Sequence, residues 1–181
     1  MEGTIEAPPQ AARVKAAAPT EAAFEALYRT SRDDVFAYLA GLLRDRSAAE
    51  EITAQAFERA WRKRASFDAG RGNRRAWLFG IARNAALDEL RRRSRQAEMV
   101  AEPNDEFAAD PASAADGIEL RLALKTAIGG LEPRQRELIA LKFFAGLGNG
   151  EIAEVLGVSE SNVGTRIHRT ITKLRRSCNE A

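Results

Sequence analysis

The sequence contains very few of the side chains on which metal centres, disulfide frameworks and nucleophilic active sites depend. Of its 181 residues, only Cys178 is a cysteine and only His168 is a histidine. A lone cysteine excludes a disulfide framework and a thiolate metal site, and a lone histidine excludes a site built from several imidazoles. A nucleophile motif and a glycine-rich phosphate loop are also missing, so we expect no catalytic residue, no metal, no cofactor and no enzymatic activity.

Long apolar runs are missing as well. No segment approaches the roughly 20 apolar residues that cross a bilayer, and the N-terminus lacks the apolar core of a secretory signal. These two absences predict a cytoplasmic protein without a membrane-inserted segment. Aromatic residues make up only 7% of the chain, and the abundant Ala, Arg, Leu and Glu favour helices over strands.

Charge is plentiful, and it is unevenly distributed along the chain. Residues 71–95 hold eight Arg against two acidic residues, and residues 134–176 hold eight basic against four acidic residues. Between these two blocks, residues 98–119 hold seven acidic residues and no basic one. Two basic blocks on either side of an acidic spacer indicate two places where a polyanion binds. For either block alone, a solvated arginine-rich helix face is the alternative interpretation.

Apolar residues at spacings of three and four predict an all-α protein made of two small helical domains. The first domain, residues 21–97, follows a disordered leader of residues 1–20 that contains three prolines. Its second helix is expected to begin with a capping box in which Ser47 is the N-cap and Glu50 reaches back. Residues 98–117 are rich in Ala, Pro and acidic residues and are expected to form a flexible linker to the second domain, residues 118–178.

The most informative segment is a helix-turn-helix pattern that begins at Glu151. A short helix is expected to end at Gly157, which supplies a left-handed residue, and Ser159 is expected to cap the next helix. That next helix has the apolar stripe Val163, Ile167, Ile171 and Leu174, and it is expected to enter the major groove of DNA. Its expected outer face carries Ser161, Asn162, Thr165, Arg166, Arg169, Thr170 and Lys173, with His168 on the DNA-facing side or at its rim.

The order of these motifs resembles that of the bacterial extracytoplasmic-function sigma factors, the short members of the sigma-70 family. The resemblance covers residues 20–178 and rests on the helix from Glu50 to Trp61, the block from Arg75 to Asp88, and the helix-turn-helix. It implies a promoter-specificity subunit whose partners are core RNA polymerase, promoter DNA and an anti-sigma factor. The first domain, sigma region 2, would dock on the polymerase clamp and open the −10 element. The second, sigma region 4, would read the −35 element as duplex.

The resemblance also implies site residues in both domains. The loop from Ser66 to Arg75 would close over an extruded base, and arginines at the end of the following helix would hold phosphates. The residues assigned to the −10 element are Arg74, Arg75, Asn84, Asp88, Arg91 and Arg92. Those assigned to the −35 element are Ser161, Asn162, Thr165, Arg166, His168, Arg169 and Lys173. Polymerase docking is assigned to Glu51, Gln55 and Glu58.

Three departures from the family pattern are visible. Ala54-Gln55 stands where a Gln-Glu pair is common, Asn149 replaces the usual Ser or Thr cap, and Gly164 occupies a commonly basic position. A glycine inside a helix costs about 1 kcal/mol relative to Ala. The alternative function is a free-standing helix-turn-helix regulator that dimerises through its N-terminal helices and binds a palindromic site without polymerase.

Overall fold

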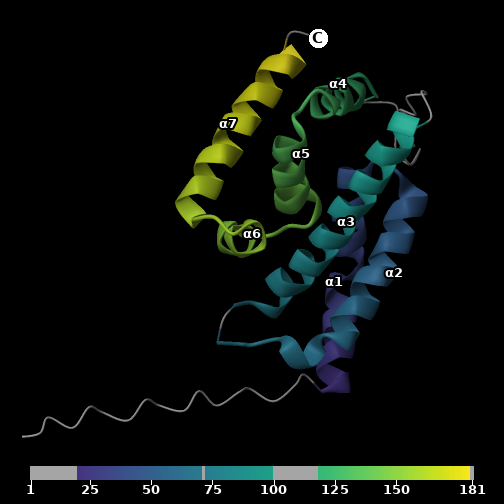
Figure 1. The fold of residues 1–181 in the computed structure, drawn as a ribbon. Helices are drawn as coiled ribbons and strands as arrows, with labels where there is room; N and C mark the ends of the chain where they lie inside the picture. The colour runs from purple at the N-terminus through teal and green to yellow at the C-terminus, as the bar shows by residue number, and fades with distance from the viewer. Residues whose placement is uncertain (1–19, 71, 100–117, 180–181) are drawn as a thin grey trace, which may run out of the picture.

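All regular structure in the described part of the chain is helical, which confirms the expected all-α fold. The coordinates are a computed structural model that describes residues 20–70, 72–99 and 118–179. Residues 1–19 of the expected leader and almost all of the expected linker lie outside the described residues. None of the described helices is long and apolar enough to span a bilayer. The elements, labelled in Figure 1, are α1 (Glu21–Leu43), α2 (Arg46–Arg62), η1 (Arg64–Ser66), α3 (Arg74–Met99), α4 (Ile118–Gly129), α5 (Pro133–Ile139), η2 (Ala140–Phe144), α6 (Asn149–Leu156) and α7 (Glu160–Asn179).

Helices α1, α2 and α3 pack side by side around the expected apolar stripes. Helix α1 ends at Leu43, and its C-cap residue Arg44 adopts a left-handed conformation with φ 56°. The expected cap of α2 is wrong: α2 begins at Arg46, and Asp45 accepts a 3.0 Å hydrogen bond from the Ala48 amide. Ser47 lies inside the first turn. The cap shifts because a left-handed residue at Arg44 reverses the chain and places Asp45 in the extended conformation that an N-cap needs.

The second half of the chain is built from α4 to α7. Pro133 begins α5 as expected, but α5 continues as a five-residue π-helix, η2, that the sequence did not indicate. Gly146 follows with φ 64°. The expected cap of α6 is also wrong, because Asn149 is the first residue of the helix and Gly148 occupies the cap position. The Gly148 amide donates to Glu151 Oε2 at 2.9 Å, and Asn149 Oδ1 accepts from Lys142 Nζ at 3.1 Å.

Helices α6 and α7 form the expected helix-turn-helix. Gly157 ends α6 with φ 67°, and the Asn162 amide donates to Ser159 Oγ at 3.3 Å, as expected for an N-cap. Val163 and Ile167 are buried on the inner side of α7. Thr170 was expected on the outer face, and this is wrong. It is 2% exposed and donates to the Arg166 carbonyl at 2.8 Å, so its polarity is satisfied within the helix and it joins the inner stripe.

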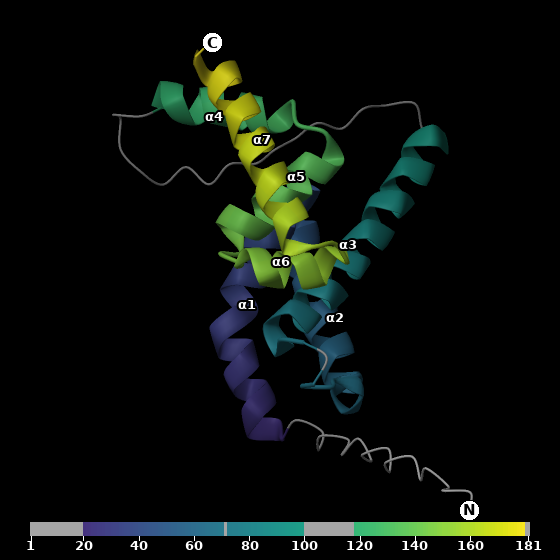
Figure 2. The same ribbon diagram turned by 90° about the vertical axis from the view of Figure 1, so that its left-hand side faces the viewer.

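The two halves of the chain pack against each other and share one continuous hydrophobic core. Helix α6 packs on α3, while η2 and α5 pack on α1. The approach of η2 to α1 depends on Gly41, since a Cβ atom there would lie 2.5 Å from Phe144 Cε2. In Figures 1 and 2, α6 lies beside the first half of α3, and α7 is the outermost helix, on the side of the molecule away from α2. The surface expected to dock on polymerase and the recognition helix therefore face different directions.

Candidate nucleic-acid and polymerase surfaces

A cavity of about 510 Å³ lies between the loop that follows α2 and the first half of α3. Phe67 and Trp77 line it with their rings 5.5 Å apart, and the Arg74 guanidinium lies 5.2 Å from the Phe67 ring centre. Asn84 is exposed and also lines the cavity. Aromatic walls beside a hydrogen-bonding amide are the features that a protein uses to hold an unstacked base. Asn84 thus lines the cavity, whereas Arg74 contacts one of its aromatic walls without lining it.

Arg75 and Asn73 both donate to residues of the second half of the chain, although Asn73 itself is exposed. The Arg75 guanidinium lies 2.7 Å from Asp34 Oδ2 and 3.5 Å from Glu151 Oε2, and it also donates to the Ala145 carbonyl at 2.6 Å. The Asn73 amide donates to Glu154 Oε2 at 3.0 Å, and the Asn73 side chain donates to Glu151 Oε1 at 3.0 Å. Two carboxylates of α6 therefore occupy donors of the expected −10 surface.

A second polar contact between the two halves is largely buried. Arg83 Nε donates to Glu137 Oε1 at 2.6 Å, and Arg83 Nη2 donates to Glu137 Oε2 at 3.4 Å. The Glu137 side chain is 9% exposed and the Arg83 side chain 27%. Tyr38 of α1 is fully buried nearby, and burial raises the pKa of its phenol, an effect that the negative charge of Glu137 strengthens. Tyr38 is therefore neutral at physiological pH.

The arginines at the end of α3 are held by carboxylates of the same half. Arg91 pairs with Asp88 at 3.2 Å, and both side chains are exposed. Arg92 and Arg93 both donate to Glu89, at 2.8 Å and 2.7 Å. The bonds from Arg92 above all hold the pKa of Glu89 below its ordinary value, against the opposing effect of burial. The exposed residues Asp88, Arg91 and Arg92 thus form one charged surface at the end of α3.

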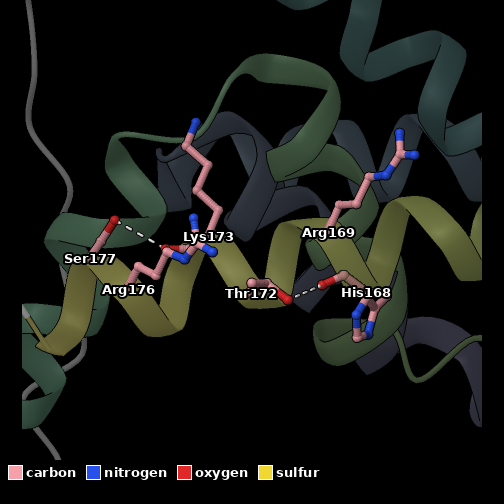
Figure 3. A pocket seen from close by; sticks show the side chains of 6 residues that line it. All are labelled: His168, Arg169, Thr172, Lys173, Arg176 and Ser177. Atoms are coloured by element: carbon pink, nitrogen blue, oxygen red, sulfur yellow. Dashed lines mark hydrogen bonds between the residues drawn. The ribbon is translucent and has the colours of Figure 1, made fainter.

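Helix α7 presents two polar rows to solvent. One row, at spacings of four and three, contains Ser161, Thr165, His168 and Thr172 and carries no formal charge when His168 is neutral. The adjacent row contains Asn162, Arg166, Arg169 and Lys173. In Figure 3 the Arg169 and Lys173 side chains rise from one edge of α7, and the His168 ring lies at the other. Every −35 residue expected from the sequence is exposed.

The hydroxyl groups of the uncharged row are oriented by the helix itself. Thr165 donates to the Ser161 carbonyl at 3.1 Å, and Thr172 donates to the His168 carbonyl at 2.9 Å. A threonine whose proton is used in this way presents oxygen lone pairs outward. Those lone pairs match the amino groups that adenine and cytosine expose in the major groove.

The residues expected to dock on polymerase lie on α2. Gln55 Nε2 donates to Glu51 Oε1 at 3.0 Å, and Glu58 pairs with Arg62 at 2.6 Å. Glu51 and Glu58 are exposed and Gln55 is half-buried. Among the residues that the structure describes, no group of three or more histidine, cysteine or carboxylate side chains is placed to hold a metal ion.

Family models match both halves of the chain, in the order that the motifs predicted. Sigma-70 region 2 matches residues 27–96, and Sigma-70 region 4 matches residues 121–174. The ECF RNA polymerase sigma factor SigL of Mycobacterium tuberculosis is 31% identical over 173 residues, which cover 93% of this chain and 97% of that protein. The chain belongs to the extracytoplasmic-function sigma factors. It is an RNA polymerase sigma factor, and no comparison favours a free-standing regulator.

Further relatives of this sigma factor extend the comparison to solved structures. SigK of Mycobacterium bovis is 28% identical, over 86% of this chain and 85% of that protein. The sigma factor RpoE of Bartonella quintana, solved with the anti-sigma factor NepR, is 25% identical with a TM-score of 0.73. That match covers 86% of this chain and 96% of the solved chain. CnrH, solved with the cytosolic domain of CnrY, is 26% identical with a TM-score of 0.61, over 89% and 90% of the two chains.

A set of residues that joins the two halves of this sigma factor was not predicted from the sequence. Asn73 donates to both α6 carboxylates, and Glu137, Glu151 and Glu154 accept from residues of sigma region 2. The only sequence signal was that these are three of the four acidic residues in the predominantly basic block of residues 134–176. That signal identifies them as unusual but does not name their partners.

Proposed function

We propose that the chain is a cytoplasmic promoter-specificity subunit that is not itself an enzyme and acts through core RNA polymerase. Residues 21–97 form the polymerase- and −10-binding region, residues 98–117 the linker, and residues 118–178 the −35-binding region. The observation that carries the proposal is the presence of both sigma regions, in order, on one chain with two basic nucleic-acid surfaces. Glu51, Gln55 and Glu58 of α2 dock on the polymerase.

The −10 element is captured at the cavity between the loop and α3. Phe67 and Trp77 supply aromatic surface for an extruded base, and Asn84 supplies the donor and acceptor that distinguish one base edge from another. Arg74, Arg75, Arg91 and Arg92 hold the phosphates on either side, and Asp88 orients Arg91. This division assigns sequence recognition to one amide and affinity to the arginines.

The −35 element is read by α7 in the major groove. Ser161, Thr165 and His168 of the uncharged row face the base edges. Asn162, Arg166, Arg169 and Lys173 of the adjacent row track the phosphate backbone, although Arg166, close to the helix start, also reaches a base edge. A shallow groove beside Arg169 and Lys173 continues this basic surface toward Arg176.

An anti-sigma factor is a further proposed partner. The sigma factor RpoE of Bartonella quintana was solved in complex with the anti-sigma factor NepR, and CnrH in complex with the cytosolic domain of CnrY. Both matches cover more than four fifths of this chain. We expect an anti-sigma factor to bind the form of the protein in which the two halves are packed together.

Transcription in vitro with core polymerase tests the proposed function directly. Core polymerase supplemented with the chain should initiate at a distinct set of promoters on genomic DNA, and core polymerase alone should not. Asn84→Ala should reduce permanganate reactivity of the melted region, since a lost base contact costs about 1–3 kcal/mol. Ser94→Ala, an exposed residue of the same helix, is the matched control. If no defined start sites appear, the proposed function is wrong.

The two rows of α7 predict different effects on duplex binding. Lys173→Ala should weaken binding to all duplexes equally and reduce the salt slope by about one unit. Thr165→Ala should instead reduce the preference for the cognate −35 sequence over a mutated one. Fluorescence anisotropy over a salt series, with matched and mismatched duplexes, measures both effects. A change in sequence preference for Lys173→Ala alone would show that α7 docks in another orientation.

A further inference from the structure

The acidic side of α6 lies against the surface that the proposed function assigns to the −10 element. Glu154 Oε2 accepts from the Asn73 amide at 3.0 Å, and Glu151 Oε1 accepts from the Asn73 side chain at 3.0 Å. Glu151 Oε2 also lies 3.5 Å from Arg75 Nη1. The donors are a backbone amide, a side-chain amide and a guanidinium, which bind phosphate oxygens as readily as carboxylate oxygens. The two α6 carboxylates therefore stand where phosphate oxygens would be bound.

Helix α6 also forms one wall of the cavity between the loop and α3. Glu154 and Val155 line it together with Trp77 and Asn84. At the loop itself the fit is close, because a Cβ atom at Gly72 would lie 2.6 Å from Glu154 Oε2. A nucleotide that entered this cavity with its phosphates on Asn73 and Arg75 would meet the α6 side chains.

The recognition helix is not covered in the same arrangement. Ser161, Thr165, Arg166 and Arg169 are all exposed, and α7 is the outermost helix of the second half of the chain. Packing of the two halves therefore obstructs one nucleic-acid surface and leaves the other accessible. If the acidic residues only neutralised positive charge in general, the two nucleic-acid surfaces would be affected alike.

We propose that α6 is an intramolecular occupant of the −10 surface, with Glu151 and Glu154 in place of nucleic-acid phosphates. Single-stranded DNA binds the cavity only after the two halves separate, whereas duplex DNA binds α7 in the packed form. The proposal rests on the proposed function, because it requires that the cavity beside Asn84 binds single-stranded DNA.

Two variants that act by different physical means should separate the halves. Glu151→Gln/Glu154→Gln removes the charges that hold Asn73 and Arg75 but keeps the hydrogen bond at the start of α6, since Gln serves in a capping box as well as Glu. Gly41→Leu changes no charge; its side chain displaces Phe144 and moves η2 away from α1. The matched control is Glu25→Gln/Glu50→Gln, which removes the same amount of charge from exposed positions of α1 and α2.

The measurements use the full chain without polymerase. Small-angle X-ray scattering reports separation as a larger radius of gyration, and circular dichroism verifies that each variant is folded. Fluorescence anisotropy reports binding to fluorescein-labelled DNA of mixed sequence, once single-stranded and once as duplex. For both separating variants we expect single-strand affinity to rise about tenfold, which corresponds to about 1.4 kcal/mol. Duplex affinity should change by less than about threefold, as should both affinities of the control.

Each other result overturns the inference in an identifiable way. If the radius grows but single-strand affinity does not, α6 does not compete with nucleic acid. If neither the radius of gyration nor the single-strand affinity changes for Glu151→Gln/Glu154→Gln, these carboxylates do not hold the halves together. An equal rise in the control would assign the effect to net charge alone. Adding Asn84→Ala to either separating variant should cancel part of its gain in single-strand affinity. If the whole gain remains, the single strand binds somewhere other than the cavity beside Asn84. The proposed function fails separately, if wild-type chain with core polymerase starts no transcription.

Discussion

The buried pair Arg83–Glu137 offers a quantitative test of the packed arrangement, because its partners come from opposite halves of the chain. The pair makes one short bond of 2.6 Å and a second of 3.4 Å. Hydrogen bonds to charged groups contribute about 1.5–3 kcal/mol. The loss of a partner in a fully buried pair costs about 3–5 kcal/mol, but Arg83 is 27% exposed and can regain some water. We therefore expect a coupling free energy of about 1.5–3 kcal/mol.

The assay is a double-mutant cycle in urea with Glu137→Ala, Arg83→Ala and the double variant. One unfolding transition is expected, because the hydrophobic core is continuous between the two halves. The matched control is the Arg62–Glu58 pair, which has the same residue types and the same 2.6 Å distance but is 75% and 58% exposed. Exposed pairs of this kind contribute about 0.3–0.5 kcal/mol.

A coupling free energy for Arg83–Glu137 no larger than that of the control would refute the reasoning. It would mean that the two halves are not packed in solution as they are in this structure. The coupling between Arg83 and Glu137 requires that packing, whereas the coupling between Arg62 and Glu58, both in α2, does not. The single variants alone could not show this. Glu137→Ala also removes apolar contacts, which the cycle cancels.

Three further predictions concern local features. Asp45→Ala should lower the free energy of unfolding by about 1 kcal/mol through the lost cap of α2, whereas Ser47→Ala should change it by less than about 0.5 kcal/mol; urea midpoints decide between the two caps. The pKa of Glu89 lies below its ordinary value of 4.5. The ionised carboxylate therefore stabilises the fold above pH 4.5, and this contribution is lost as the pH falls through the lowered pKa. Glu89→Gln should flatten the acid side of a curve of unfolding free energy against pH. Gly164→Ala should raise the free energy of unfolding by about 1 kcal/mol, since its Cβ would make an ordinary 3.7 Å contact with Asn149. DNA affinity should not change in Gly164→Ala, and a gain in DNA affinity seen only with Gly164→Arg would come from the added charge.

The helices and the helix-turn-helix could be predicted because their signals are local. The apolar spacing around Val163 and Ile167, the left-handed Gly157 and the cap at Ser159 lie within one segment. Local signals also explain the errors. Ser47 and Asp45 are both good caps, and only the left-handed Arg44 decides between them. A buried Thr170 cannot be distinguished from an exposed one, because its hydroxyl is satisfied by its own helix.

The contacts between the halves could not be predicted, because their partners are far apart in the sequence. Glu137 is 54 residues from Arg83, and Glu154 is 81 residues from Asn73. In the sequence, each of these acidic residues occupies a position that an amphipathic helix normally turns toward solvent. A glycine such as Gly41 gives no sign in the sequence that an aromatic ring will pack on it. The relative placement of the halves is thus a property of the folded chain that sequence periodicity does not contain.

The arginines of α3 differ in how freely they can exchange a carboxylate for a phosphate. When Arg91 moves to a phosphate, only the exposed carboxylate of Asp88 loses its partner. When Arg92 moves to a phosphate, Glu89 keeps a partner because Arg93 still donates to it. Arg93 cannot leave as easily. It joins Glu89 to Asp45 Oδ2 at 2.7 Å, and without it Asp45 loses its ion pair and the buried Glu89 keeps a single partner. An unpaired buried charge costs far more than an exposed one. We therefore expect Arg91 and Arg92 to supply the DNA contacts at this end of α3, and Arg93 to keep α3 attached to the start of α2.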